Sequence, residues 1–394
     1  MRPDSRVFYG LSTAGALAIL SSTMSKNPVL PLLSSSLGAE GFSLGLIASA
    51  STIPGILVSL PAGSLSDLVG RKRVMLVAAF VFATAPFMYL AVSTPLQLIL
   101  VRFYHGFATA IFGPVANATI VDRYPSRKAE RLSIFSSSTI AGRGIAPFLG
   151  GAVLILTNSN FKDVYWVVGA AGVSALIAIA FVFKGSGGPP PGPAERRMGI
   201  GHQVRAIVAN RLVVIASYIQ AVQYFTYGAF EFFVVSYAKA VQLDLASITL
   251  ISGIQLVAVI SSQPALGRLS DKFGRSWLIA IGLAAGGISL PLVPLTTSLW
   301  LLLAVAILYG LGFSAVTSST SALVSDLTSG TSSGSAMGFL STLMDVGQTS
   351  GPIVTGLILA TPLGYLGAFW FLGFFLVLSV GPFAWSFMIG RRGS

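Results

Sequence analysis

The sequence predicts an all-α membrane protein with twelve transmembrane helices in two pseudo-symmetric six-helix bundles. Hydrophobic residues make up 54% of the 394-residue chain and charged residues only 9%, whereas an ordinary soluble domain carries about 25% charged residues. A stretch of the first half, Gly63 to Arg71, also recurs in the second half as Gly267 to Arg275. The chain therefore consists of two related apolar halves in series, with the bilayer as their solvent.

The repeat extends to other positions at the same offset. Gly106 corresponds to Gly310, and Asp122 corresponds to Asp326. A duplicated membrane bundle whose sites lie at the interface of its repeats is the architecture of many secondary transporters. We therefore expect a transporter from the duplication alone.

Each expected span is long enough, at about 20 residues, to cross the hydrocarbon as a helix. Only helices or closed barrels satisfy every backbone polar group in lipid, and the unbroken apolar runs exclude the alternating pattern of a barrel. Glycine and proline are frequent within the spans, where neighbouring helices tolerate them. In order, the expected spans cover roughly 7–33, 42–62, 74–93, 95–121, 132–156, 164–183, 211–238, 246–266, 277–295, 299–324, 336–360 and 364–389.

A stretch rich in glycine and proline, residues 185–193, follows the sixth span and predicts a flexible linker. A short basic segment, Arg196 to Arg211, comes next and is expected to lie on the inner membrane surface. We therefore divide the chain into an N-terminal bundle of residues 1–184, a cytoplasmic linker of residues 185–204 and a C-terminal bundle of residues 205–394. The other loops are too short for a separate soluble domain.

The formal net charge of +12 follows membrane topology rather than a nucleic-acid surface. If the N-terminus is inside, most of the 24 Lys and Arg residues face the inside, and the outward loops hold only Lys162 and Lys239. This asymmetry is the positive-inside rule, which predicts that both termini are cytoplasmic. No cleavable signal peptide is evident, since the first apolar run has no clear cleavage site. We expect a multi-pass protein of the cell (inner) membrane with no nucleic-acid partner.

The residue inventory excludes several chemistries. The chain has no cysteines, which excludes disulfides, thiolate metal sites and cysteine nucleophiles. It has only two histidines, no HExxH or paired-aspartate arrangement within a span, and no Gly-rich loop ending in Gly-Lys-Ser/Thr. We therefore expect that the protein is not an enzyme, does not hydrolyse ATP, and holds no metal and no cofactor.

Three motifs resemble those of the major facilitator superfamily. Gly63 to Arg73 resembles the signature G-x-L-x-D-x-x-G-R-(K/R) between the second and third helices. Arg102 to Gly106 resembles the fourth-helix motif R-x-x-Q-G, with His105 in place of glutamine. Gly142 to Gly151 resembles the fifth-helix motif G-x-x-x-G-P-x-x-G-G, with Ala146 replacing one glycine. The last motif is associated with twelve-span drug:proton antiporters, so the resemblance implies the major facilitator fold and alternating access.

The resemblance also implies a cytoplasmic gate at the inner ends of the spans. Asp67 would accept hydrogen bonds at the positive end of the eleventh span, while Arg71 would form an ion pair with Asp122. The matching residues of the second half are Asp271, Arg275 and Asp326. The alternative is a solvated turn whose charges only set the topology.

Ionisable residues within spans are candidates for the substrate and proton pathway. A Lys, Arg or Asp at a helix centre costs about 2.5–3.5 kcal/mol, so such residues usually face a cavity or a partner. Those of this chain are Lys26, Arg102, Arg143, Glu231 and Asp345. Gln348, in the eleventh-span relative of the fifth-helix motif, is a further candidate.

One face of the seventh span is polar and predicts a water-lined wall. At helical spacing it carries Gln220, Gln223, Tyr224, Tyr227 and Glu231. The resemblance implies that spans one, four, seven and ten line the central cavity. Glu231 corresponds to Asn27, next to Lys26, so a Lys26–Glu231 pair across the pseudo-twofold axis is one interpretation. The alternative is that both side chains reach water at the outer surface.

The remaining candidates also keep two interpretations. The resemblance links Arg102 to proton coupling or substrate charge, and a structural arginine bonded to carbonyls is the alternative. His105, one turn away, is either a proton relay or a hydrogen-bonded packing residue. Asp345 is the best candidate for a carboxylate that loads and releases a proton, unless it forms a static ion pair with Arg143.

These residues lead to two functional expectations. The first is proton-coupled efflux, by antiport, of small amphipathic or drug-like molecules, which the fifth-helix motif and the many aromatic residues favour. The alternative is a proton-coupled carrier of a small organic anion, because Arg102 and Arg143 could bind a carboxylate bidentately. The expected partners are a small-molecule substrate, protons as the coupling ion and the lipid bilayer, and we expect a monomer.

Overall fold

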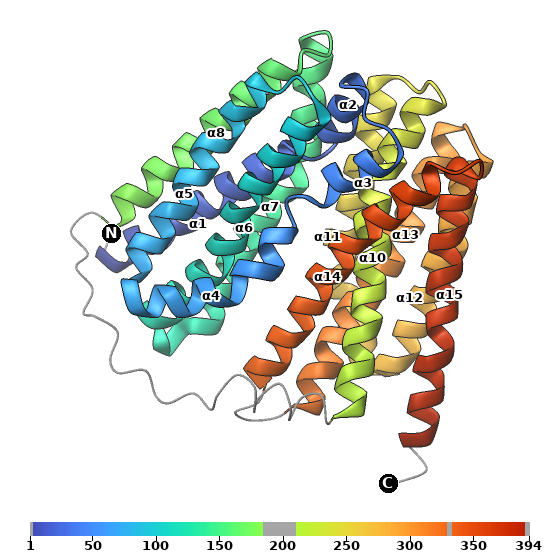
Figure 1. Ribbon diagram of the computed structural model, residues 1–394. Helices are drawn as coiled ribbons and strands as arrows, with labels where there is room; N and C mark the ends of the chain where they lie inside the picture. Colours follow the sequence, from blue (N-terminus) through green and yellow to red (C-terminus); the bar gives the residue numbers. More distant parts are fainter. Residues whose placement is uncertain (1–2, 184–209, 329–332, 391–394) are drawn as a thin grey trace. The chain divides into compact units, whose positions relative to one another are not determined.

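The computed structural model describes residues 3–183, 210–328 and 333–390, and every element of regular structure in these ranges is a helix (Figure 1). Contacts divide the chain into two compact units. Unit 1 consists of Met1–Ala39 and Ala50–Glu195, and unit 2 consists of Glu40–Ser49 and Arg196–Ser394. The expected linker, residues 185–204, lies outside the described residues, so the bundle boundaries stay a prediction.

The helices of unit 1 are α1 (Pro3–Met24), α2 (Val29–Ser36), α4 (Ile53–Val69), α5 (Arg71–Met88), η1 (Tyr89–Ala91), α6 (Pro95–Arg123), η2 (Pro125–Arg127), α7 (Lys128–Leu156) and α8 (Phe161–Val182). The helices of unit 2 are α3 (Gly41–Ser49), α10 (Arg211–Ala240), α11 (Leu245–Phe273), α12 (Arg275–Leu292), η3 (Val293–Leu295), α13 (Leu299–Leu327), α14 (Ser333–Leu359) and α15 (Gly364–Gly390).

Most of these helices suit a bilayer. Ten segments of the described residues are long and apolar enough to cross a membrane. The two other long helices, α10 and α14, have 30 and 27 residues. Large apolar side chains such as Leu156 and Trp300 are 82% and 77% exposed, as expected of surfaces that face lipid. The predicted all-α membrane fold is confirmed.

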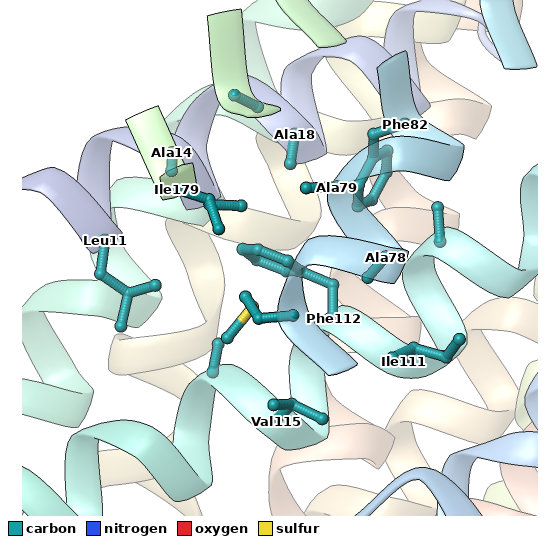
Figure 2. Packing of buried hydrophobic residues seen from close by; sticks show 14 of the residues in the cluster. Leu11, Ala14, Ala18, Ala78, Ala79, Phe82, Ile111, Phe112, Val115 and Ile179 are labelled. Atoms are coloured by element: carbon teal, nitrogen blue, oxygen red, sulfur yellow. The ribbon is translucent and has the colours of Figure 1, made fainter. Parts of the chain in front are cut away.

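The core of unit 1 depends on small residues that let helices approach closely. Ala14 and Ala18 of α1 and Ala79 of α5 are fully buried in one cluster (Figure 2). Phe82 and Phe112 belong to the same cluster, with their rings edge to face at a centroid distance of 5.8 Å. Because lipid tails are as apolar as the core, such close packing is a main driving force for association of membrane helices.

Spans one and two are not the single helices that the sequence predicts. The first is interrupted between α1 and α2, and the second is interrupted between α3 and α4. Pro28 and Pro54 stand at the start of the second piece in each case. Proline has no N–H, so neither residue can donate to the carbonyl one turn earlier. The prediction overlooked that a span can be apolar throughout and still be two helices.

The first piece of span two, α3, packs on α14 (Figure 1). A Cβ added at Gly45 would lie 2.9 Å from the Cα of Ile353, so the two backbones almost touch there. The Ser49 hydroxyl donates a 2.6 Å hydrogen bond to the carbonyl oxygen of Thr349. These contacts explain why Glu40–Ser49 is grouped with unit 2, an exchange that no sequence pattern predicted.

Candidate functional site

The first candidate site is the corner where α4, α5 and α6 meet in unit 1. A single residue, Gly70, connects α4 to α5 with a φ of 101°, a conformation that glycine adopts without a steric penalty. Arg71 donates from Nε to Asp122 Oδ2 at 3.0 Å, and a second N–H contacts the Ser66 hydroxyl. The Arg71–Asp122 pair implied by the family resemblance is therefore present. The Asp67 side chain lies outside the described residues, so its gate role stays a prediction.

Unit 2 contains a second corner with the same geometry. Gly274 has a φ of 98°, and Arg275 donates from Nε to Asp326 Oδ2 at 3.1 Å. Arg275 Nη1 also contacts Asp271 and lies 3.4 Å from the Ser270 hydroxyl. The Asp326 side chain is 58% exposed, and exposed ion pairs contribute only about 0–1 kcal/mol. These arginine corners therefore fix the relative positions of helix ends more than they stabilise the fold.

Arg102 and Gly106 of the fourth-helix motif converge on Ser51, in the turn before α4. Arg102 is 2% exposed and donates from Nη2 to the Ser51 hydroxyl. A Cβ added at Gly106 would lie 2.9 Å from the Ser51 Cα and closer still to its carbonyl oxygen. Within the described residues Arg102 Nε has no hydrogen-bond partner. The arginine thus bonds a hydroxyl, whereas its structural interpretation had predicted carbonyls.

His105 lies in a buried aromatic cluster of unit 1. Its Nδ1 is 3.3 Å from the Tyr89 hydroxyl, and the Tyr89 ring stacks on Tyr165 at a centroid distance of 4.3 Å. The Tyr165 hydroxyl donates to the Ser25 carbonyl oxygen at 3.4 Å. His105 is itself 2% exposed. This environment favours the packing interpretation of His105 over the relay. Neither tyrosine was a candidate, because aromatic residues at helix ends are common in membrane proteins.

The glycine rows of the fifth-helix motif and its relative set the distance between helices. Gly142 of α7 meets the carbonyl oxygen of Ala16 in α1, and Ala146, one turn on, is fully buried. In unit 2, Gly347 of α14 meets the carbonyl oxygen of Ala221 in α10. Small residues allow this approach of backbones. The motif therefore has a packing role in both units.

Arg143 and Asp345 are charged candidates whose side chains are not buried. Arg143 is exposed in the middle of α7, and Asp345 is partly exposed in the middle of α14. Neither forms an ion pair within the described part of the chain. Because Arg143 belongs to unit 1 and Asp345 to unit 2, the static pair weighed as the alternative stays a prediction. Gln348 of α14 lies against α10, with its carbonyl oxygen 2.7 Å from a Cβ added at Gly228.

The polar face of α10 is covered by α13. Thr320 donates to the Gln220 side chain, and the Tyr227 ring stacks on Phe313 at a centroid distance of 4.2 Å. The Tyr227 hydroxyl donates to Glu231 Oε1 at 3.4 Å, and Glu231 is 7% exposed. In this structure the face is therefore an interface between helices. That it also lines water at another stage stays a prediction.

Gln223, Lys26 and Asn27 complete the predicted set. Gln223 is fully buried, and its amide has no hydrogen-bond partner in the described ranges. Lys26 and Asn27 lie in the turn between α1 and α2, where both backbone N–H groups donate to the Thr23 carbonyl oxygen. The structure thus gathers Arg102 and His105 in unit 1, and Gln223, Tyr227 and Glu231 in unit 2. The Lys26–Glu231 pair stays a prediction.

The comparisons with known proteins agree with this architecture. The model of the Major Facilitator Superfamily matches residues 11–237 and again residues 216–393. The chain is 28% identical to a multi-drug resistance efflux pump PmrA homolog of Lactococcus lactis, over 93% of this chain and 90% of that protein. It is 22% identical to the quinolone resistance protein NorA of Staphylococcus aureus, over 84% of each.

The solved structure of the nucleoside transporter NupG superposes with a TM-score of 0.78 at 17% identity, covering 97% of this chain and 99% of that one. At this identity the similarity concerns the fold alone. The duplicated corners, the apolar helices and the family match together lead to one conclusion. The chain belongs to the major facilitator superfamily, and it is an integral, multi-pass membrane transporter rather than an enzyme.

Proposed function

We propose that this transporter exports small amphipathic or drug-like molecules in exchange for protons, by alternating access. The observation that carries the proposal is Asp345, a carboxylate in the middle of α14 that is partly exposed and has no ion-pair partner in the described ranges. A charge at that depth is costly unless it meets water or binds a proton. Asp345 is therefore suited to take up a proton on one side of the membrane and release it on the other.

The relatives support the substrate class. The PmrA homolog is named for multi-drug resistance and NorA for quinolone resistance, and each covers most of this chain. At 28% and 22% identity they favour drug-like substrates without identifying one. In this proposal the protein acts as a monomer in the cell membrane. Both termini and both arginine corners face the cytoplasm, as the positive-inside rule predicts.

Purified protein in liposomes tests the proposal. With an imposed inward proton gradient, wild-type protein is expected to move cationic dyes outward, and Asp345→Asn is expected to abolish this movement. Asp244→Asn is the matched control, because Asp244 is an exposed carboxylate at the start of α11 and asparagine caps a helix equally well. Normal gradient-driven export by Asp345→Asn would contradict the carrier role.

A second function, proton-coupled transport of a small organic anion, is favoured by Arg143. Its guanidinium is exposed in the middle of α7 and unpaired within the described residues, and a guanidinium binds carboxylates bidentately. The same liposomes, offered organic anions instead of dyes, distinguish the two. Anion movement that is lost in Arg143→Gln, with no dye movement, would replace the first proposal by the second.

A further inference from the structure

We propose that the end of unit 1 at which α6 leads into α7 binds the phosphate group of an anionic phospholipid. The site consists of the basic side chains of this connection, called the basic patch: Arg123, Arg127, Lys128 and Arg131. Such a site goes beyond the proposed function, because its ligand is a lipid and not a transported substrate. Only its leaflet rests on that function, whose orientation places the basic patch on the cytoplasmic side.

Arg131 is held by aromatic rings rather than by a carboxylate. Its Cζ lies 4.4 Å from the centroid of the Phe8 ring and 5.5 Å from that of the Tyr124 ring. These two rings meet edge to face at a centroid distance of 5.7 Å. Within the described residues Arg131 forms no ion pair, and its Nε is buried without a hydrogen-bond partner. A guanidinium stacked on a ring uses its face and keeps N–H donors at its edge, so Arg131 is positioned by the fold and its charge is left for a ligand.

The other basic side chains lie close to Arg131. Arg127 is the N-cap of α7, and both Arg127 and Lys128 are exposed. They precede Arg131 by four and three residues, the spacings at which side chains are neighbours on a helix. Arg123 lies in the last turn of α6, with its Cζ 6.0 Å from the centroid of the Phe183 ring. In the described ranges none of the three forms an ion pair. The connection therefore presents several uncompensated cations to an anion.

This concentration of positive charge is specific to the first half of the chain. Residues 123–131 contain four basic residues and one acid, Glu130. At the offset that relates the halves, the basic patch matches Leu327, Thr331, Ser332 and Ser335, and Phe8 matches Leu212. Both halves nevertheless keep an arginine corner at this end of the helices. The repeated fold thus does not require the basic patch, which favours a role in binding.

Exposed apolar side chains beside the basic patch favour a lipid over a free anion. Ile134 follows Arg131 by three residues on α7 and is 39% exposed, and Val121 of α6 is 38% exposed. Tyr9, next to Phe8 in α1, is 48% exposed, and tyrosine is enriched where a membrane meets water. A phospholipid matches both parts of this surface, with its phosphate at the cations and its acyl chains at the apolar residues. Clusters of Lys and Arg at the cytoplasmic ends of membrane helices bind anionic head groups in this way.

Titration of the purified protein with lipid tests the site. Delipidated wild-type protein in a neutral detergent receives phosphatidylglycerol, phosphatidylcholine or inorganic phosphate in separate arms. Native mass spectrometry measures binding, and the melting temperature measures the stabilisation that a ligand of the folded state produces. We expect phosphatidylglycerol to bind and to raise the melting temperature more than either of the others. An equal response to phosphatidylcholine would overturn recognition of the negative charge, and an equal response to inorganic phosphate would overturn the lipid as the ligand.

Variants of the basic patch locate the site. We expect Arg131→Gln and the double variant Arg127→Gln/Lys128→Gln each to weaken phosphatidylglycerol binding at least about fivefold, the effect of removing one basic residue beside an anionic lipid. Because Arg127 and Lys128 are exposed, the double variant should fold normally and keeps the test independent of packing at Arg131. Arg131→Lys keeps the charge but not the planar donors, so it should bind more tightly than Arg131→Gln.

Lys272→Gln is the matched control. Lys272 is an exposed base in the last turn of α11, outside the basic patch, and the positive-inside rule places it on the same side of the membrane. We expect this variant to bind phosphatidylglycerol as the wild type does. Unchanged binding in both variants of the basic patch, or an equal loss in Lys272→Gln, would overturn the site.

Lipid binding in detergent requires neither a proton gradient nor a transported dye, so it is separable from the proposed function. Dye export by a wild-type protein that does not bind phosphatidylglycerol would overturn the lipid site and leave export intact. Binding that the variants of the basic patch lose, in a protein that exports no dye, would support the lipid site and overturn export.

Discussion

The two halves of the chain share their arginine corners but differ in their opening spans. Arg71–Asp122 and Arg275–Asp326 have almost the same length, 3.0 and 3.1 Å, and each follows a glycine with φ near 100°. These corners depend on one-residue connections, which leave little freedom for change. The duplication has therefore kept its geometry where the backbone itself demands particular residues.

The opening spans are broken in the first half of the chain and continuous in the second half. At the offset that relates the halves, Phe232 matches Pro28 and Ala258 matches Pro54, and both lie inside the unbroken helices α10 and α11. Proline alone does not explain the difference, since Pro147 lies inside the continuous helix α7. In unit 1, α6 makes additional contacts with the turn at which span two is interrupted.

That set of contacts has no full counterpart in unit 2. Ala306 matches Arg102, and Gln255 matches Ser51. Gly310 keeps the close approach of its partner Gly106, with a Cβ position 3.0 Å from the Gln255 carbonyl oxygen. The glycine contact is thus common to both halves, and the arginine contact is specific to the first. Arg102 is therefore found only in the half whose second span is interrupted, and it is not a feature that the two halves share.

The largest loss of stability is expected when a proline is introduced into the second half, at the position that matches Pro54. Ala258→Pro in α11 should destabilise the protein by about 3 kcal/mol, because it removes a helix hydrogen bond and crowds the preceding turn. Pro54→Ala should cost less than about 1 kcal/mol, because alanine is a good helix former. Apparent melting temperatures in detergent measure both. Equal losses of stability in the two variants would show that both halves tolerate an interrupted helix equally well, which would contradict the difference between them.

A smaller loss of stability is expected from replacing the two matching glycines, Gly106 and Gly310, by alanine. Gly106→Ala should cost about 1–3 kcal/mol, because the added methyl meets Ser51 backbone atoms that cannot yield. Gly310→Ala should cost less than Gly106→Ala, since its closest contact is 3.0 Å and alanine gains helix propensity. The same melting experiment compares them. A more damaging change at Gly310 would contradict the tighter contact in unit 1.

The stabilisation contributed at the start of α11 should depend on pH, unlike that at the start of α3. Hydrogen bonds from the Ser247 hydroxyl and then from its backbone N–H lower the pKa of Asp244, the N-cap of α11. The folded-state pKa is below the unfolded value, so this cap stabilises the protein above about pH 4 and is lost as the pH falls. Asp244→Ala should cost about 1 kcal/mol at neutral pH and less at pH 3. A loss independent of pH would exclude the carboxylate as the cap.

The matching position in the first half, Glu40, is arranged differently. There the Ser43 hydroxyl accepts a hydrogen bond from the Glu40 backbone N–H at 2.9 Å. Since this bond does not use the carboxylate, Glu40→Gln should leave the hydrogen bond in place. It therefore serves as the control for Asp244.

The smallest effect on stability is expected at the corners. Arg71→Gln and Arg275→Gln should each cost about 0–1 kcal/mol, because the acidic partners are more than half exposed. If the corners form the proposed gate, both variants should nevertheless lower dye transport strongly while protein yield stays normal. Transport at the wild-type rate in both variants would show that the charges of the corners only set the membrane topology.

Sequence reasoning succeeded where a signal is local. The Arg71–Asp122 pair followed from the resemblance of its motif to the family's, and helical spacing placed the polar residues of α10 on one face. It failed where the determining contact is distant in sequence. Nothing about Ser51 distinguishes it from other serines in apolar spans until the fold brings α6 beside it. The cover of Gln220 and Tyr227 by α13 likewise depends on tertiary packing.

Proton movement during dye efflux is the sharpest test of the proposed exchange of substrate for protons. Liposomes carrying the protein and an internal pH indicator, with no imposed gradient, receive an outwardly directed gradient of a cationic dye. We expect dye efflux by the wild type to acidify the interior, and we expect Asp345→Asn to move no protons. Dye efflux without acidification, or acidification that persists in Asp345→Asn, would contradict it.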